Sequence, residues 1–224
     1  MPTAIEAPEE VHETLADVLE RIGKVPLARI PAWPPPGMAK EKHVLAALEA
    51  SDKRLFELVD GVLVEKTMGV QESYLAAFLI HVLSDFLMRH DLGFVLGADG
   101  MARLAPGLVR IPDVSFISWQ KVPDRRIPRV PMLGFAPDLA VEVLSPGNTP
   151  QEMERKLQDY FAAGVNLVWY INPANRTVEA FTSAGTSTLL REDEGLSGEP
   201  VLPGFLLPLR DLFARLRQPS NRPN

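Results

Sequence analysis

Cysteine is absent from the sequence, which excludes disulfide bonds, catalytic thiolates and thiolate metal sites. Histidine is scarce, and the four histidines form neither HExxH nor another zinc-ligand spacing, so we interpret them as ordinary side chains. Apolar runs stay short of the roughly 18 residues that a membrane span needs, and the acidic N-terminus lacks the basic and apolar regions of a signal peptide. These absences predict a cytoplasmic protein that does not bind a membrane.

The chain has 224 residues and a formal net charge of -6. This length suits one α/β domain with elaborations better than two independent domains. The net charge argues against a protein that coats nucleic acid through bulk electrostatics. Between residues 103 and 129, however, basic residues outnumber acidic ones, which indicates either a cationic rim for a polyanion or a solvated arginine-rich loop. The basic residues of this stretch are Arg103, Arg110, Lys121, Arg125, Arg126 and Arg129.

Three segments differ in composition. Residues 1–37 contain a helical pattern over residues 8–23 and then a proline-rich stretch over residues 25–37. That stretch has too many prolines for regular structure, and we interpret it as an extended spacer, with a partner-binding polyproline segment as the alternative. Residues 38–216 form the main domain, and residues 217–224 are predicted to be a disordered tail.

The first half of the main domain begins with two local signals. Asp60-Gly61 separates two apolar runs and favours φ > 0 at both turn positions, which predicts a β-hairpin. Residues 71–90 carry apolar side chains at i, i+3, i+4 and i+7, which predicts the main core helix. The expected elements are a helix over residues 39–50, hairpin strands over 55–59 and 62–66, the core helix, and short strands over 94–97 and 101–104 that turn through 98–100.

The second half alternates strands and helices. Its expected elements are strands over residues 112–118 and 138–144, a helix over 150–163, a strand over 165–171, an antiparallel strand over 176–182 and a short helix within 209–216. The helix from Pro150 has a well-marked start, because Thr149 can cap it and Glu152 can reach back to complete a capping box. This order of elements predicts the α/β class, with a mixed sheet flanked by helices.

Two acidic residues in the predicted sheet indicate a metal site. Glu142 lies in an almost wholly apolar strand, where a buried carboxylate without a cation or a donor is strongly unfavourable. Asp113 stands at the start of the preceding strand. Because neighbouring strands lie about 4.8 Å apart, the two carboxylates can share one ion if their strands are adjacent and both side chains point to one face. Oxygen ligands of this kind suit Mg²⁺ or Mn²⁺.

Lys156 is a candidate partner of these acids. It lies at the edge of the apolar stripe of the predicted helix, so its stem can pack while its ammonium reaches the strand ends. There it would stabilise charge on a phosphoryl transition state or orient the attacking water. The alternative is a helix-surface ion pair, because Glu152 and Asp159 lie one turn away on either side.

A set of motifs in a fixed order carries a family resemblance. The motifs are Phe56-Glu57-Leu58-Val59-Asp60-Gly61, Pro112-Asp113-Val114, Glu142-Val143-Leu144-Ser145-Pro146, Lys156-Leu157 with Tyr160, Val168-Trp169-Tyr170-Ile171 and Leu202-Pro203-Gly204-Phe205. Together they resemble the Uma-two-type putative restriction endonuclease family, formerly a domain of unknown function, in the PD-(D/E)XK nuclease superfamily. The likeness covers residues 52–216. It implies a restriction-endonuclease-like mixed sheet flanked by helices, with an N-terminal hairpin and helical extension, and makes residues 38–216 an endonuclease-like domain.

The resemblance also implies roles for single residues. Asp113 matches the aspartate of the PD element, and Glu142 matches the acidic residue of the (D/E)XK element. Leu144 replaces the lysine that the superfamily pattern places two positions after Glu142, and in this family the lysine is moved to the helix, which implies Lys156. Glu57 matches the family's hairpin glutamate, as a further ligand or a support; a surface charge on the hairpin is the alternative.

These residues predict a Mg²⁺- or Mn²⁺-dependent endonuclease that hydrolyses phosphodiester bonds in nucleic acid, with DNA as the expected substrate and RNA as the alternative. Asp113 and Glu142 would hold the metal. A second hypothesis is a catalytically inactive binding or scaffolding protein of the same fold. A third is a glycosidase that uses the two acids as its acid and base, but it would leave Lys156 without a function. Cutting both strands of a duplex requires two active sites, which favours a homodimer.

Overall fold

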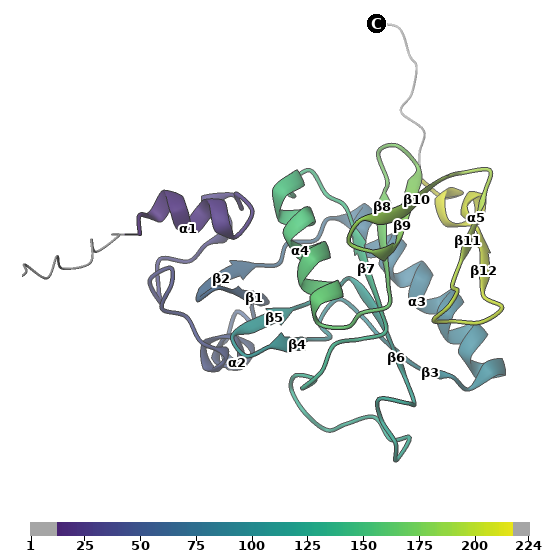
Figure 1. Ribbon diagram of the computed structural model, residues 1–224, viewed down its shortest axis with the longest axis horizontal. Coiled ribbons are helices and arrows are strands. Elements are labelled where there is room, and N and C mark those ends of the chain that lie inside the picture. The colour runs from purple at the N-terminus through teal and green to yellow at the C-terminus, as the bar shows by residue number, and fades with distance from the viewer. Residues whose placement is uncertain (1–12, 217–224) are drawn as a thin grey trace, which may run out of the picture.

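The computed structural model describes residues 13–216, which form two main β-sheets flanked by helices (Figure 1). This arrangement confirms the predicted α/β class. None of the helices in the described part is long and apolar enough to cross a membrane. The predicted tail at residues 217–224 and the first part of the predicted helix at residues 8–23 lie outside the described residues. The division of the chain at residues 37 and 216 stays a prediction.

The larger sheet has six strands in the order β10-β9-β8-β7-β6-β3. The strands are β3 (Gly93–Leu96), β6 (Val114–Ser118), β7 (Leu139–Val143), β8 (Leu167–Asn172), β9 (Thr177–Ser183) and β10 (Thr186–Arg191). Strands β7 and β8 are parallel, and the other neighbouring pairs are antiparallel. Helix α4 (Pro150–Ala162) makes the crossover between β7 and β8. The adjacency of β6 and β7, on which the predicted metal site depends, is therefore present.

Helices cover both faces of this sheet (Figure 1). Helix α3 (Val70–His90) and helix α5 (Leu209–Phe213) pack on one face, and α4 packs on the other. Side chains alternate between the faces along each strand. On β7, Val141 lies in the core under α3, whereas Ala140 lies in the core under α4. Glu142 follows Val141 and therefore points toward α4.

The smaller sheet has four strands in the order β2-β1-β5-β4. They are β1 (Phe56–Val59), β2 (Val62–Glu65), β4 (Ala102–Ala105) and β5 (Leu108–Arg110). The predicted hairpin is confirmed, because β1 pairs with β2 and both Asp60 (φ 48°) and Gly61 (φ 76°) have positive φ. Helix α2 (Glu41–Glu49) packs against one face of this sheet.

The N-terminal segment covers the other face of the small sheet. Helix α1 (Leu15–Arg21) places Val18 in a buried cluster with Val59 and Val62. A short 3₁₀ turn (Leu27–Arg29) follows within the proline-rich stretch, and its arginine is bound to residues of the main domain. The interpretation of this stretch as an extended spacer is therefore wrong, because packing and ion pairing fix it to the main domain.

Two predicted connections also differ from the structure. Strands β3 and β4 do not form a hairpin, because β3 pairs with β6 and β4 pairs with β5. Strand β5 was not predicted, although Pro106-Gly107 is a turn signal and Gly107 has φ 77°. Strand β10 and the small β11 (Gly195–Ser197) and β12 (Leu206–Pro208) pair were also missed. Strand β10 is an edge strand with mostly exposed side chains, so it lacks an apolar pattern.

Helix α4 begins at the predicted residue, but the side chain of Glu152 binds a different partner from the one predicted. Thr149 is the N-cap, and its hydroxyl accepts the Glu152 N–H at 3.0 Å. The Glu152 side chain does not reach back to Thr149, because it binds Arg29 instead. The helix ends before Gly164, whose φ of 84° fits the left-handed position that glycine favours.

Candidate functional site

Asp113 and Glu142 lie opposite each other on neighbouring strands. Val114 of β6 is paired with Val141 of β7 in an antiparallel register, so the residue before Val114 faces the residue after Val141. Both acidic side chains are buried, with residue exposures of 5% for Asp113 and 4% for Glu142. The condition that both carboxylates lie on one side of the sheet is met, because a single lysine contacts both.

That lysine is Lys66, which directly follows β2. Its Nζ lies 2.8 Å from Asp113 Oδ1 and 4.0 Å from Glu142 Oε2. It also donates a hydrogen bond to the Ile111 carbonyl. The distance between the two carboxylate oxygens is therefore at most the sum of these two distances. One cation with its bound waters can span that separation.

The other two oxygens of these acids accept hydrogen bonds from the protein. Asp113 Oδ2 accepts the Val143 backbone N–H at 2.6 Å. Glu142 Oε1 accepts from the Tyr160 hydroxyl at 2.5 Å and from Lys156 Nζ at 3.1 Å. These bonds fix the orientation of both carboxylates, so Asp113 Oδ1 and Glu142 Oε2 are the oxygens that face Lys66.

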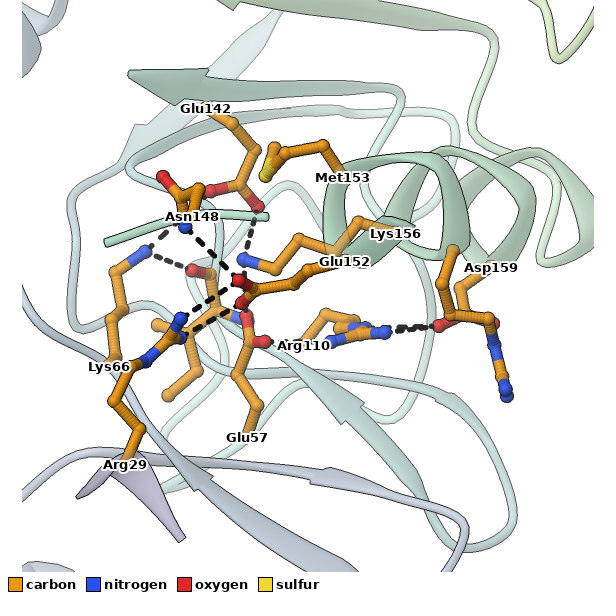
Figure 2. A network of polar contacts seen from close by, with 12 residues as sticks. Arg29, Glu57, Lys66, Arg110, Glu142, Asn148, Glu152, Met153, Lys156 and Asp159 are labelled. Atoms are coloured by element: carbon orange, nitrogen blue, oxygen red, sulfur yellow. Dashed lines mark hydrogen bonds and ion pairs between the residues drawn. The ribbon is translucent and has the colours of Figure 1, made fainter. Parts of the chain in front are cut away.

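Lys156 lies inside the protein rather than on a helix surface. It is 3% exposed, and its Nζ lies 3.0 Å from Glu57 Oε1 and 3.1 Å from Glu142 Oε1 (Figure 2). Burial lowers the pKa of Lys156, but the negative charges of Glu142 and Glu57 outweigh it and raise the pKa above its ordinary value. The alternative prediction, that Lys156 forms a helix-surface ion pair with Glu152 and Asp159, is therefore wrong.

Glu57 is also buried, at 1% exposure, so the alternative of a surface charge on the hairpin is wrong. Its Oε1 accepts the Ile111 N–H at 3.1 Å, and its Oε2 accepts from Arg110 at 2.8 Å. Burial raises the pKa of Glu57, but the cations Lys156 and Arg110 outweigh it and hold the pKa well below its usual range. Arg110 in turn binds Asp159 of α4 at 2.5 Å. Figure 2 shows this chain of contacts from Glu57 to Asp159.

Glu142 has a pKa shift of the opposite sign. Burial raises its pKa, and the nearby negative charges of Asp113 and Glu57 add to the rise, although Lys156 and Lys66 offset part of it. The pKa shifts of Glu142 and Glu57 therefore have opposite signs, although both carboxylates contact Lys156. A cation beside Glu142 Oε2 would favour the charged form of Glu142.

A small cavity opens beside these groups. Its volume is about 20 Å³, which is enough for one water molecule or one ion. Its lining includes Lys66, Glu72, Asp113, Glu142 and Lys156. A wider cleft of about 520 Å³ borders it at the start of α4 and shares Glu72 with it. The cleft and the cavity also share Ser145 and Asn148, so the two lie side by side.

The residues around the cavity fit a magnesium-like ion only if waters or a substrate complete its shell. No group of three or more His, Cys, Asp or Glu side chains within residues 13–216 is arranged to hold a metal. Asp113 and Glu142 each present one carboxylate oxygen to Lys66, and Glu72 adds a third carboxylate to the lining of the cavity. Mg²⁺ in phosphoryl-transfer sites is commonly bound by one or two carboxylates, with water and substrate phosphate supplying the rest. The donor set is consistent with that pattern.

Arg29 closes one side of the cavity. It forms a two-pronged ion pair with Glu152, with distances of 2.8 and 2.9 Å (Figure 2). It also donates to the Glu65 carbonyl at 2.9 Å and to the Gly147 carbonyl at 3.4 Å. A further contact lies nearby, where the Thr149 hydroxyl donates to a carbonyl of the N-terminal segment at 2.6 Å. The segment therefore joins the small sheet to the start of α4 over the site.

Sequence reasoning missed Lys66, Arg110 and Arg29 as members of this cluster. For Lys66 and Arg110 a signal existed. Side chains two positions apart in a strand lie on the same face of the sheet. Lys66 therefore shares the covered face of Val62 and Val64, and Arg110 shares that of Leu108. Arg29 gave no such signal, because its ion-pair partner Glu152 lies more than a hundred positions later in the chain.

The loop that follows β6 begins at the far end of the strands from this site. It occupies residues 119–137 and joins the end of β6 to the start of β7, whereas Asp113 precedes β6 and Glu142 lies near the end of β7. Five residues at about 3.3 Å each separate the two ends by roughly 16 Å. Lys121 and Arg125 of this loop are in ion pairs with Asp138 and Asp91, and the choice between a cationic rim and a solvated loop stays a prediction. Arg110, from the same basic stretch, does reach the site as a buried side chain.

Comparison with known proteins gives a family and a fold. Residues 43–210 match the family model Uma2, described as "putative restriction endonuclease". The fold is similar to a crystal structure described as a putative nuclease belonging to DUF820 from Anabaena variabilis ATCC 29413, with a TM-score of 0.64 and 18% sequence identity over 71% of this chain and 90% of that chain. At that identity the likeness shows a shared fold. No curated protein matches the chain.

Proposed function

The chain belongs to the Uma2 family, and from this membership and the buried charge cluster we propose that it is a metal-dependent endonuclease that hydrolyses phosphodiester bonds in nucleic acid. The expected substrate is DNA. A cytoplasmic location and a homodimer, with one site for each strand of a duplex, are parts of the same proposal.

The convergence of one oxygen from Asp113 and one from Glu142 on the same position, where Lys66 now contacts both, carries this proposal. Asp113 Oδ1 and Glu142 Oε2 face the same cavity, and the other oxygen of each acid is held by the protein. These two acids would hold Mg²⁺ or Mn²⁺. A divalent cation there would supply Lewis-acid stabilisation of negative charge on the phosphate and would activate water.

The neighbouring side chains prepare Glu142 for this role. Lys156 and Tyr160 both donate to Glu142 Oε1, which leaves Oε2 facing Lys66, and the charge of Lys156 offsets part of the rise in the pKa of Glu142 that burial causes. Lys156 also places a positive charge where negative charge develops on the phosphoryl group. Glu57 has donors on both oxygens, which supports a role in holding Lys156 rather than in binding the metal.

The experiment compares variants that keep the shape of the acids. We expect Asp113→Asn and Glu142→Gln to lose Mg²⁺-dependent cleavage of plasmid and single-stranded DNA by about a hundredfold or more. Asp138→Asn is the matched control, because Asp138 is a buried acid at the opposite end of β7 and accepts the Ser118 N–H at 2.7 Å, which asparagine can also accept. A parallel RNA substrate tests the choice of DNA. Full cleavage by either acid variant, with folding confirmed, would falsify the proposal.

The second candidate is a catalytically inactive binding protein of the same fold. The burial of the whole cluster favours it, because Asp113, Glu142, Lys156 and Glu57 are each at most 5% exposed. Titration calorimetry with Mg²⁺ and Mn²⁺ separates the two. Metal binding that Glu142→Gln abolishes supports the nuclease, whereas absence of metal binding and of cleavage supports the binding protein.

A further inference from the structure

Lys66 occupies an unusual position for a lysine. It is the first residue after β2, and its backbone N–H still bonds to the Leu55 carbonyl at 2.9 Å, so its backbone remains fixed to the small sheet. Its side chain is 8% exposed and crosses to the large sheet, where it meets Asp113 and Glu142. The lysine therefore connects the two sheets at the proposed metal position.

The ammonium of Lys66 contacts the same two oxygens that a metal would use. Asp113 Oδ1, at 2.8 Å, and Glu142 Oε2, at 4.0 Å, have no other donor among residues 13–216. A divalent ion that shared these oxygens would lie within about 2 to 2.5 Å of them. An ammonium and a divalent cation cannot both occupy that space, and their charges repel each other.

We propose that Lys66 is a built-in counter-cation that competes with the divalent metal for Asp113 and Glu142 and thereby sets the metal affinity of the site. This inference rests on the proposed function, since it concerns the same two acids. Without metal, the ammonium compensates the buried carboxylates. With metal, the flexible four-carbon stem swings away from them.

Lys156 does not compete with the metal in this way. Its ammonium binds Glu142 Oε1, the oxygen that Tyr160 also holds, and Glu57 lies on its other side. A metal at Asp113 Oδ1 and Glu142 Oε2 leaves these contacts unchanged. Lys156 therefore serves as an internal control for Lys66.

Calorimetry tests the competition directly. We expect Lys66→Met to bind Mg²⁺ or Mn²⁺ at least about tenfold more tightly than the wild type, because the competing charge is gone and the stem is kept. We also expect the variant to melt at a lower temperature in EDTA and to recover more of its stability on adding metal than the wild type does. Equal or weaker metal binding by the folded variant overturns the inference.

A second measurement uses the wild-type chain, in case the variant does not fold. Lysines are acetylated under limiting reagent, with and without saturating Mn²⁺, and each site is read by mass spectrometry. We expect the metal to increase labelling of Lys66 and to leave Lys156 unchanged. Unchanged or reduced labelling of Lys66 in the presence of bound metal overturns the inference.

The outcomes separate this inference from the proposed function. If the wild type and Lys66→Met bind metal equally and both cut DNA, the inference fails and the nuclease stands. If only Lys66→Met binds metal and the wild type neither binds metal nor cuts, the competition stands and the nuclease falls. If neither protein binds metal, both fail.

Discussion

Replacing Arg110 with methionine tests how far the buried ion cluster supports the fold. Arg110 is 2% exposed and joins Glu57 of the small sheet to Asp159 of α4, with distances of 2.8 and 2.5 Å. Removing one partner of a buried ion pair leaves a buried charge without its counter-ion and costs about 3 to 5 kcal/mol. Methionine fills most of the space, so the loss is chiefly electrostatic.

The expected loss lies at the lower end of this range, because both acids keep other partners. Asp159 retains Arg155 at 2.9 Å, and Glu57 retains Lys156 at 3.0 Å. We therefore expect Arg110→Met to lower the free energy of unfolding by about 3 kcal/mol. For a chain of this size the melting temperature would fall by about 6 to 12 °C.

Urea unfolding at pH 7, followed by circular dichroism, measures this change. The midpoint should fall while the slope with denaturant stays the same, which would show that the compactness of the two states is unchanged. Arg89→Met is the matched control, because Arg89 is 66% exposed and its ion pair on α3 should contribute no more than about 0.5 kcal/mol. A loss below about 1 kcal/mol for Arg110→Met would refute the electrostatic reasoning.

Two further predictions concern the cover of the site and its pH dependence. Arg29→Ala removes the counter-ion of the buried Glu152, and we expect the free energy of unfolding to fall by about 3 kcal/mol. We also expect faster amide hydrogen exchange in residues 24–30. Unchanged exchange would contradict the fixed position of this segment. The pKa of Glu57 is depressed in the folded protein, so the stabilisation by its carboxylate is fully present above about pH 4.3 and is lost as the pH falls below that value. We therefore expect Glu57→Gln to have a flatter acid side of the stability profile. Urea unfolding between pH 2 and pH 7 measures this profile. An equally steep acid limb in the variant would count against that shift.

Local signals predicted those elements whose cause is local. The turn at Asp60-Gly61 follows from backbone preference, and the core helix over residues 71–90 was found within one residue of α3 because its apolar side chains repeat at helical spacing. The start of α4 was predicted from Thr149 for the same kind of reason. Strand β10 was not predicted, because an exposed edge strand needs no apolar pattern.

The candidate site could be predicted only in part. A carboxylate within an apolar strand identified Glu142, but whether Asp113 shared its side of the sheet depended on strand order and register, which are long-range properties. Lys156 was predicted to reach these acids and does contact Glu142, whereas the alternative of a helix-surface ion pair fails because its nearest acids in the helix are not its nearest acids in space. Glu57, Lys66 and Arg110 come from the small sheet, and their meeting with β7 depends on how the two sheets pack.

The attachment of Arg29 has a consequence for how the protein is made. Its partners at Gly147 and Glu152 leave the ribosome more than a hundred residues after Arg29 itself, so the arginine cannot dock while the nascent chain is short. Binding of Arg29 to these partners is therefore possible only after residue 152 has been synthesised.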